Sequence, residues 1–538
     1  MKKCWKAGTS LLLAALMLWG CGQAPAGNNQ AEPEGPVAKQ ITVAVAQDIE
    51  AGKLDAASYN GLMQAYPLVY DALVEYGAKG ENLSGLAEKW DISEDGKTYT
   101  FHLRKNVQFS DGTPFNADAV KFSIMRWANK KDHESFRTSK NIQNIEVSDE
   151  YTVKLTFSEA YYLTLTELTY ARPFRIMSPT AVEPAGDPDG KFVKAIGTGA
   201  WVVSDYKQDE QAVFTPNPNY WGSKPKLGRL VFKVIPDPQT RVLALQKNDI
   251  QLAGGSFGKI PVESLSLFNS SKDVAMKQID GTITYFFGFN NDNNILQDVN
   301  VRKALNYAIN KQDIAEKLLN GIGQPAKGLF QSTVPYVTKD NEKGYGYDLD
   351  QAKELLGAAG WKDTNGDGIA DKAGKPLTLS LVLQTEEYPE WKAIGEAAQS
   401  DLAKAGVQLE LKVLEKGAYY DALWKNKNYD LIVYRTYEDA YNPYGFLTSL
   451  FYAADKKPVL GYGDGYFNEL LDKVQSSTSE EERQQLYTEI FGLIHDQALV
   501  LPVFAPYEIL LSSKKIKPFE LGTTQSRPVV WEKLDINL

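Results

Sequence analysis

The feature that most constrains the fold is a strand–helix–strand pattern between residues 377 and 413. Every second residue from Leu377 to Leu383 is leucine, and a second alternating stretch runs from Val407 to Val413. Between them, apolar residues recur at helical spacing from 394 to 405. A helix that connects two strands of one sheet is long enough to bring them parallel. The pattern therefore predicts an α/β fold.

The hydrophobic pattern changes near residue 282. Before it, alternating strands at 98–103 and 151–157 are prominent, together with a helix that Asn116 caps. After it, helices and strands alternate, beginning with a helix capped by Asp298 and a second helix that ends at Gly321. A chain of 538 residues is long enough for two to four domains. We therefore expect a division near residue 282.

Residues 1–20 have the pattern of a signal peptide. Three lysines precede a short apolar stretch, which ends at Cys21. The residues before Cys21 resemble the lipobox of bacterial lipoproteins, so we expect cleavage before Cys21 and lipid attachment to it. An ordinary signal peptide with an incidental cysteine is the alternative. Residues 21–40 are rich in Pro, Gly, Asn and Gln and are typical of a flexible tether, here anchored to a membrane by lipid.

Composition excludes several classes of function. The net charge is -10, from 58 Lys+Arg and 68 Asp+Glu, which argues against a nucleic-acid partner. Only three histidines and two cysteines are present, too few for a His/Cys metal cage or a disulfide scaffold. No phosphate-binding P-loop motif occurs, so the chain is not an ATPase. Aromatic residues make up 11%, which favours a stacking-type ligand site.

One pattern suggests a catalytic serine. Gly254–Gly258 matches G-x-S-x-G, which would make Ser256 the nucleophile of a secreted serine hydrolase. The base would have to be His495, because no other histidine follows Ser256. Short glycine-rich patterns arise often by chance, so we favour a plain turn. Of the other histidines, we expect His102 on the solvent face of a strand and His133 in a charged surface loop.

A second pattern suggests a cation site. One loop is similar to an EF-hand calcium loop, with side-chain oxygens at positions 1, 3, 5 and 9. The residues at these positions are Asp363, Asn365, Asp367 and Asp371. The acid expected at position 12 is missing, since Gly374 stands there. The loop fits either a weak Ca²⁺ site or a metal-free turn before the strand at Leu377.

Several longer segments resemble a known family. Residues 86–115 are similar to the signature of extracellular solute-binding proteins of the oligopeptide, dipeptide and nickel type. Residues 197–201, 219–222 and 301–308 match the same family. The resemblance covers essentially the whole chain after the tether.

The resemblance implies a fold of two lobes. The fold is the α/β, periplasmic-binding-protein-like fold of a large family with an extra subdomain, and two hinge strands join the lobes. By this resemblance, lobe I comprises 41–281 and 504–538, and lobe II comprises 282–503. The division near residue 282 that the hydrophobic pattern indicates agrees with these bounds.

The resemblance also implies a role in import. Such a protein binds a small molecule between its lobes and delivers it to the permease subunits of an ABC transporter. It performs no catalysis and requires no cofactor. We expect a monomer at the outer face of a cell membrane, either extracellular or periplasmic.

Within the family, residues 171–176, 234–241 and 334–336 resemble the nickel-binding branch. That branch implies that Arg172 holds a carboxylate of a metal-chelating small molecule. A guanidinium group suits a carboxylate because it can donate two parallel hydrogen bonds. Considered without the family, Arg172 fits a structural ion pair inside lobe I equally well.

The branch implies further ligand-binding residues in both lobes. Tyr437 and Tyr441 fall on aromatic positions of a lobe II loop, Tyr59 and Met63 fall near pocket positions of lobe I, and Arg137 falls near a pocket tryptophan. Ordinary packing or surface exposure is the alternative for each tyrosine, and core filling is the alternative for Met63.

The chain departs from the branch at the metal. The nickel-binding branch contributes a histidine of lobe II to the metal. No histidine lies between His133 and His495 here, and Asp455 is the residue nearest to that position in the sequence. Imidazole is a natural ligand of Ni²⁺, so a chelator would have to supply nearly all donors. The leading hypothesis is a receptor for a small anionic chelate of nickel or a similar metal. Di- and oligopeptides are the alternative cargo, with Glu438 or Asp439 holding the α-amino group.

Overall fold

A computed structural model describes residues 39–537. Its description excludes residues 79, 134–135, 438–441, 453–457 and 461–464. The predicted signal peptide, residues 21–38 of the predicted tether with Cys21, Tyr441 and Asp455 therefore lie outside the described residues and stay predictions. The predicted end of the tether at residue 40 is wrong, because Gln40 begins a strand and Lys39 forms an ion pair with Asp535.

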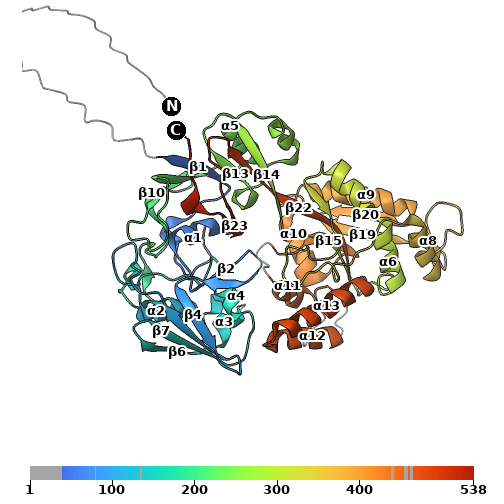
Figure 1. Cartoon of the computed structure of the whole chain (residues 1–538). Coiled ribbons are helices and arrows are strands. Elements are labelled where there is room, and N and C mark those ends of the chain that lie inside the picture. The colour runs from blue at the N-terminus through green and yellow to red at the C-terminus, as the bar shows by residue number, and fades with distance from the viewer. Residues whose placement is uncertain are drawn as a thin grey trace, which may run out of the picture. The chain divides into compact units, whose positions relative to one another are not determined.

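A large mixed β-sheet organises the fold (Figure 1). Twelve strands of the described residues belong to it. Its path in space runs through β10 (Trp201–Lys207), β11 (Gln211–Pro216), β12 (Arg229–Val234), β1 (Gln40–Val45), β13 (Leu252–Gly254), β22 (Val500–Ser513), β15 (Tyr285–Phe289), β21 (Leu431–Arg435), β19 (Thr378–Leu383) and β20 (Gln408–Val413). Off this path, β14 (Val274–Asp280) and β16 (Gly323–Pro325) pair with β22.

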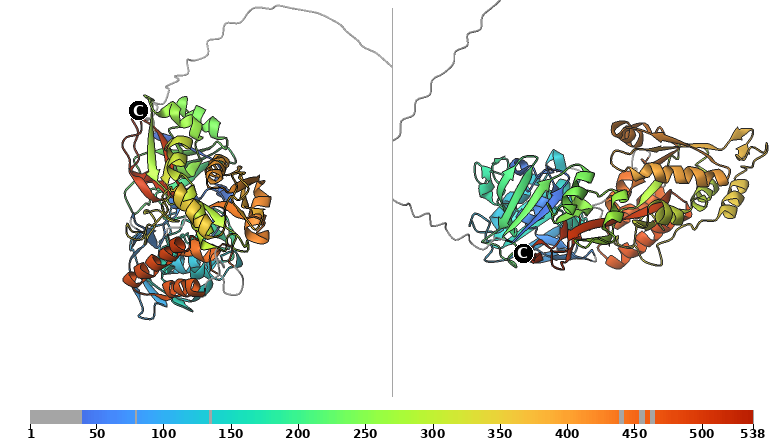
Figure 2. Two further views of the ribbon diagram at one scale, coloured as in Figure 1. Left: turned by 90° about the vertical axis from the view of Figure 1, so that its right-hand side faces the viewer. Right: turned by 90° about the horizontal axis from the view of Figure 1, so that it is seen from above.

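The long strand β22 belongs to both halves of the sheet. Its later residues, from Tyr507 to Ser513, lie antiparallel to β14, and its earlier residues, from Val500 to Phe504, lie antiparallel to β15. The dark red strand in the right-hand view of Figure 2 runs from one group of strands to the other. A single strand of 14 residues therefore holds the two halves in one hydrogen-bonded sheet.

Two large hydrophobic cores lie on either side of this crossing. The first core contains residues from 41 to 257 together with residues from 510 to 536, and the second contains residues from 283 to 504. Tyr161 and Leu163 are exceptions, because they come from the earlier part of the chain and pack in the second core.

The predicted strand–helix–strand unit is confirmed. β19 and β20 pair in parallel, and α9 (Glu390–Lys404) connects them. The helix buries Ile394, Ala398 and Leu402. Gly406 follows the helix with φ +84°, a conformation that glycine adopts without the steric cost that a Cβ atom would bring.

The strand-rich start of the chain forms a separate antiparallel sheet. Every second residue of β5 (Thr98–Leu103) is buried, as the alternation predicts. Asn116 caps α2 (Ala117–Trp127), since its Oδ1 accepts a hydrogen bond of 3.0 Å from the backbone N–H of Ala119. In spatial order the strands are β4 (Ala87–Ile92), β5 (Thr98–Leu103), β7 (Thr152–Phe157) and β6 (Ile142–Asp149).

The remaining elements are shorter or cover the sheets. The helix predicted around Ile314 is instead a short α7 (Lys311–Asp313) that continues as a π-helix, η7 (Ile314–Leu318). None of the described helices combines the length and the apolar character that a membrane span needs. The other α-helices are α1 (Tyr66–Val69), α3 (Arg137–Asn141), α4 (Thr164–Glu167), α5 (Pro238–Gln246), α6 (Val299–Ala308), α8 (Leu349–Ala358), α10 (Lys416–Asp421), α11 (Pro443–Leu450), α12 (Gly465–Ser476) and α13 (Glu480–Asp496). Two-stranded ribbons are formed by β2 (Val74–Tyr76) with β3 (Asn82–Ser84), β8 (Val182–Glu183) with β9 (Lys191–Phe192), β17 (Asp371–Lys372) with β18 (Lys375–Pro376), and β23 (Leu521–Thr524) with β24 (Arg527–Val529).

Candidate functional site

Arg172 is held beside a short stretch of backbone more than a hundred residues away in the chain. Its Nη1 donates hydrogen bonds to the carbonyl oxygens of Tyr59 (2.8 Å), Gly61 (2.9 Å) and Asn60 (3.3 Å). The guanidinium carbon lies 5.4 Å from the centre of the Tyr59 ring and 5.8 Å from that of Tyr66. These contacts fix the position of the positive charge and neutralise none of it.

The structure does not form the ion pair that was the alternative for Arg172. Among the described residues, no carboxylate lies in ion-pair contact with its guanidinium group, and the side chain is only half-buried. The hydrogen bonds to these three carbonyl groups all run from Nη1. The geometry therefore fits a cation that is kept ready for an external anion.

The ring of Tyr59 is the centre of an aromatic group. It is 45% exposed and stacks on Phe136, with ring centres 5.9 Å apart and planes 10° apart. His133 lies on the same ring at 5.8 Å. Phe136 in turn packs edge-on against Tyr170 and Phe174. Sequence reasoning missed Phe136, although it directly precedes the predicted Arg137.

The position expected for His133 is wrong. The charged stretch around it predicted a surface loop, but it ends the 3₁₀ turn η3 (Lys131–His133) with only 5% of its surface exposed. Lys131 and Asp132 are exposed while the imidazole packs beside Tyr59, so local charge gave no sign of the burial. His102 is half-exposed on β5 and contacts Asp91 at 2.8 Å, close to what alternation predicts.

Met63 and Arg137 lie near the same group. Met63 is half-buried in the 3₁₀ turn η2 (Met63–Ala65), two residues after Gly61. Arg137 begins α3, where its Nη1 lies 3.2 Å from Oε1 of Glu159. The guanidinium carbon of Arg137 is 6.0 Å from the centre of the Tyr161 ring. The charge of Arg137 is thus already paired, in contrast to that of Arg172.

A buried carboxylate supports the start of α3. Glu167, which is 6% exposed, accepts a hydrogen bond from the backbone N–H of Thr138 and another from the hydroxyl of Tyr161, each 3.0 Å long. Burial raises the pKa of Glu167, while these hydrogen bonds and the charge of Arg137 act in the opposite direction. The hydrogen bond from Thr138 to Glu167 therefore holds the backbone in place one residue after Arg137.

Tyr437 belongs to the second core. Its ring packs edge-on at 5.0 Å against Phe446, and its hydroxyl lies 2.7 Å from Oγ of Ser449. Tyr441 lies outside the described residues. Of the described candidates, Tyr59 and Arg172 are thus in contact, whereas Arg137 contacts Glu159 and Tyr161 and Tyr437 packs on the second core.

Tyr162 comes from the first half of the chain but contacts residues of the second core. Its hydroxyl donates to Oδ1 of Asn442 (2.9 Å) and lies 2.5 Å from the hydroxyl of Tyr487. The guanidinium carbon of Arg483 lies 4.8 Å from the centre of the Tyr162 ring. Burial raises the pKa of Tyr162 well above its usual range, so this hydroxyl keeps its proton. No motif in the sequence indicated this contact.

The acidic loop at 363–371 satisfies its own oxygens. Asp363 accepts hydrogen bonds from the backbone N–H groups of Gly366 and Gly368, and Asp371 accepts from the backbone and hydroxyl of Thr364. No group of three or more His, Cys, Asp or Glu side chains in the described part of the chain is arranged to hold a metal ion. These bonds favour the metal-free turn, and the Ca²⁺ site stays an untested prediction.

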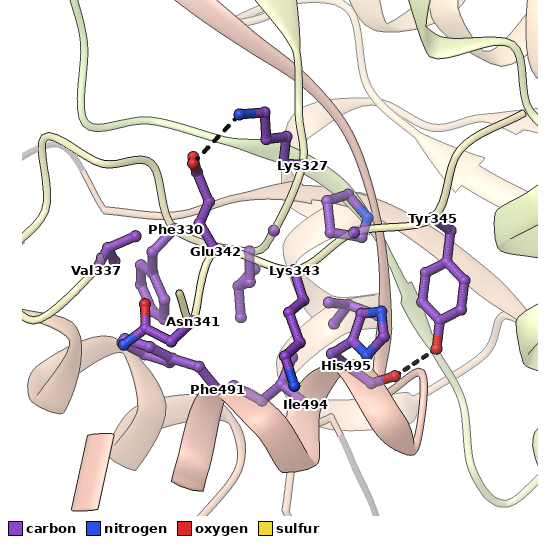
Figure 3. A pocket seen from close by; sticks show the side chains of 15 residues that line it. Lys327, Phe330, Val337, Asn341, Glu342, Lys343, Tyr345, Phe491, Ile494 and His495 are labelled. Carbon is purple, nitrogen blue, oxygen red and sulfur yellow. Dashed lines mark hydrogen bonds and ion pairs between the residues drawn. The ribbon is translucent and has the colours of Figure 1, made fainter. Parts of the chain in front are cut away.

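Ser256 and His495 each have other partners. The hydroxyl of Ser256 donates to the carbonyl of Gln525 at 2.8 Å, within the turn η5 (Gly255–Phe257). His495 lies on α13, where its ring stacks on Tyr345 at 4.6 Å and the hydroxyl of Tyr345 donates to its backbone carbonyl (Figure 3). The pocket in Figure 3 belongs to the second core and is lined by Lys327, Gly328, Leu329, Phe330, Val337, Asn341, Glu342, Lys343, Gly344, Tyr345, Phe491, Ile494, His495, Val500 and Pro502.

Comparison with known proteins identifies the family. The model of bacterial extracellular solute-binding proteins, family 5 Middle, matches residues 83–458, which is more than half of the chain. The chain belongs to this family. As a family 5 solute-binding protein it is not an enzyme, so the serine hydrolase alternative is wrong.

Two curated relatives of this family 5 protein bind different cargo. The nickel-binding periplasmic protein of Escherichia coli (strain K12) is 33% identical over 500 residues, which cover 91% of this chain and 93% of that protein. The dipeptide-binding protein of the same organism is 30% identical over 460 residues, which cover 80% of this chain and 83% of that protein. The chain is therefore the substrate-binding protein of an ABC importer, in the nickel or the peptide branch, and acts outside the cytoplasm.

Solved structures show the same fold. NikA from Brucella suis in complex with Fe(III)-EDTA superposes with a TM-score of 0.83 at 31% identity, over 93% of this chain and 100% of that chain. An ABC transporter substrate-binding protein from Sinorhizobium meliloti superposes with a TM-score of 0.81 at 31% identity. The superposition covers 93% of this chain and 100% of that chain. The mixed α/β fold of periplasmic binding proteins is therefore confirmed.

Proposed function

We propose that this family 5 protein captures a small anionic metal chelate, of nickel or a similar metal, and delivers it to its permease. Arg172 would hold a carboxylate of the chelator. The ligand would be lined on the side of the first core by Tyr59, Met63 and Arg137. On the side of the second core it would be lined by Tyr437 and Tyr441. The metal is cargo, and no resident cofactor is required.

The position of Arg172 carries this proposal. Its charge is held by three carbonyl groups, and no described carboxylate neutralises it. An aromatic ring beside a guanidinium group lowers the local dielectric, which strengthens a hydrogen-bonded ion pair with a bound carboxylate. The similarity to the Escherichia coli nickel-binding protein and to NikA with Fe(III)-EDTA supports a chelate as the anion.

Short peptides are the second candidate cargo. The similarity to the Escherichia coli dipeptide-binding protein favours it, because a peptide also ends in a carboxylate that Arg172 would hold. Glu438 or Asp439, both outside the described residues, would then bind the α-amino group.

Thermal unfolding of residues 22–538 with a ligand panel separates the two cargoes. The panel contains Ni²⁺ alone, Ni²⁺ with histidine or an opine-type chelator, each chelator alone, and mixed di- to pentapeptides. A ligand at 100 times its Kd adds about 2.7 kcal/mol to the stability of the folded state, which a melting curve resolves. A shift that requires metal and chelator together supports the chelate, whereas a shift with peptides alone contradicts it.

We also propose that the molecule closes around its cargo as two lobes, 41–281 with 504–538 and 282–503. The separate cores and the crossing of β22 at Phe504–Tyr507 support this division. The protein would act as a monomer.

Anchoring through a lipid on Cys21 completes the proposal. Replacement of Cys21 by Ala should release the protein from the membrane fraction of the producing cells, because no acyl chain would then bury its CH₂ groups in the bilayer. Fractionation followed by immunoblotting measures this. A Cys21→Ala protein that stays in the membrane fraction contradicts the anchor.

A further inference from the structure

His133 is a buried imidazole that packing alone does not explain. The centre of its ring lies 5.8 Å from that of Tyr59, and its Nδ1 is buried without a hydrogen-bond partner among the described residues. A buried polar atom without a partner costs free energy that a phenylalanine at this position would avoid.

The two ring nitrogens of His133 differ in their surroundings. The backbone of Ala57 is a hydrogen-bonding neighbour of the ring, which leaves Nδ1 as the nitrogen without a partner. Burial lowers the pKa of His133 below its ordinary value of 6.5, against the opposing effects of Ala57, Asp132 and Asp55. A neutral imidazole that donates through one nitrogen to the backbone presents a lone pair on the other, which is how histidines that bind metals are oriented.

The imidazole and the guanidinium group of Arg172 lie against the same ring. The carbon at the centre of the guanidinium group is 5.4 Å from the centre of the Tyr59 ring, and the imidazole centre is 5.8 Å from it. Tyr59 is 45% exposed, and a turn of its side chain would give up the contacts of its ring with Phe136 and Arg172. A chelate bound by Arg172 would then face the imidazole.

We propose that Nδ1 of His133 binds the metal of the chelate whose carboxylate Arg172 holds, with Tyr59 turning aside as the chelate enters. This inference rests on the proposed function and names the one donor that the protein adds to the metal. A chelator that leaves at least one coordination position open is then preferred over one that fills them all, because only the former can accept an imidazole nitrogen.

The small number of histidines makes a direct test possible. The chain has three, and His102 and His495 serve as matched controls because they lie on β5 and α13, away from Arg172. The probe is Cu²⁺–nitrilotriacetate, an anionic chelate with open positions. Pulsed electron paramagnetic resonance detects the remote nitrogen of a bound imidazole. The test compares wild type, His102→Gln, His495→Gln, His133→Gln and His133→Phe.

We expect the imidazole signal in wild type and in both control variants and its loss in both His133 variants. The Kd of the chelate should rise about tenfold or more on loss of the nitrogen donor. Melting curves of His133→Phe, which keeps an aromatic ring in place, check that the fold persists.

Two results overturn the inference in distinguishable ways. An imidazole signal that persists in His133→Phe, or a wild type that binds the chelate through Arg172 without any such signal, contradicts His133 and leaves the proposed function standing. A wild type that binds no metal chelate of any kind, while it binds peptides, contradicts both.

Discussion

Arg172 and Asp363 show that a charged residue acquires its role from its neighbours. Arg172 lies beside carbonyl groups that hold its guanidinium group and leave its charge in place. Asp363 stands in a calcium-like pattern, yet its two oxygens accept hydrogen bonds from the backbone of its own loop. The first arrangement favours binding of an external ion, and the second favours a closed turn.

Replacement of Arg172 by Ala should weaken binding of the carboxylate-bearing cargo by about 2–4 kcal/mol, or roughly 30- to 1,000-fold in Kd. The reason is the loss of a charge-assisted hydrogen bond in a partly desolvated site. Isothermal titration calorimetry measures the change, with Arg229→Ala on the exposed face of β12 as the control. An affinity within about threefold of wild type would show that Arg172 does not hold the ligand.

Glu167 should make stability depend on pH. Because burial raises its pKa in the folded state, the unfolded chain releases this proton first, and the contribution of Glu167 to stability falls as pH rises above about 4.5. The side chain of the Glu167→Gln variant cannot ionise. The free energy of unfolding of the variant minus that of wild type should therefore increase as the pH rises from about 4.5 to 7. Urea unfolding across this range measures the difference, and the exposed Glu354→Gln is the control. A difference that does not change with pH contradicts the prediction.

The elements follow local patterns where one face of a helix or strand is buried. β19, α9 and β20 form the predicted parallel unit because alternation and helical spacing each place leucines on one face. The region at Lys311 departs from its pattern, since α7 continues as the π-helix η7. Lys311 is 6% exposed there, and its Nζ has no hydrogen-bond partner among the described residues.

Burial lowers the pKa of Lys311 from 10.5 to about 7. Between these values the unfolded chain binds the proton and the folded chain does not, so the contribution of Lys311 to stability rises with pH from about 7 to 10.5. Lys311→Met should remove this slope and raise the free energy of unfolding near pH 7 by about 1–4 kcal/mol. Chemical unfolding at several pH values measures it, with the exposed Lys353→Met on α8 for comparison. A destabilised Lys311→Met protein would indicate that the ammonium group has a partner in solution.

At the scale of the whole molecule, β22 and Tyr162 connect the two cores in different ways. β22 joins them by continuous backbone pairing, which persists when side chains change. Tyr162 joins the first half of the chain to the second core by the contacts of its hydroxyl with Asn442 and Tyr487 and by one backbone hydrogen bond to Gln475. A contact of the second kind can break and re-form during closure of the proposed lobes.

Tyr162→Phe should weaken cargo binding about 5- to 30-fold. It removes hydrogen bonds worth about 1–2 kcal/mol in total from the state in which the cores are joined and keeps the aromatic ring. Calorimetry measures the affinity, and small-angle scattering without ligand should show a larger radius of gyration than wild type. The exposed Tyr347→Phe is the control. Unchanged affinity and scattering would mean that Tyr162 does not help to hold the lobes together.

Local patterns and family segments were enough to predict many of the elements and the family. Alternation, helical spacing and caps such as Asn116 act between near neighbours, so they predicted β5, α2 and the βαβ unit, and the family segments predicted the fold. The ligand-binding role of Arg172 was predicted in the same way, from its motif, and stays a prediction.

Only the tertiary structure decided what surrounds these residues. The carbonyl groups on Arg172 come from Tyr59 and Gly61, and the buried ring of His133 lies beside that of Tyr59. Tyr162 meets Asn442 across 280 residues of chain. Such contacts form when distant segments pack to bury apolar surface, and no local period in the sequence records which segments will meet.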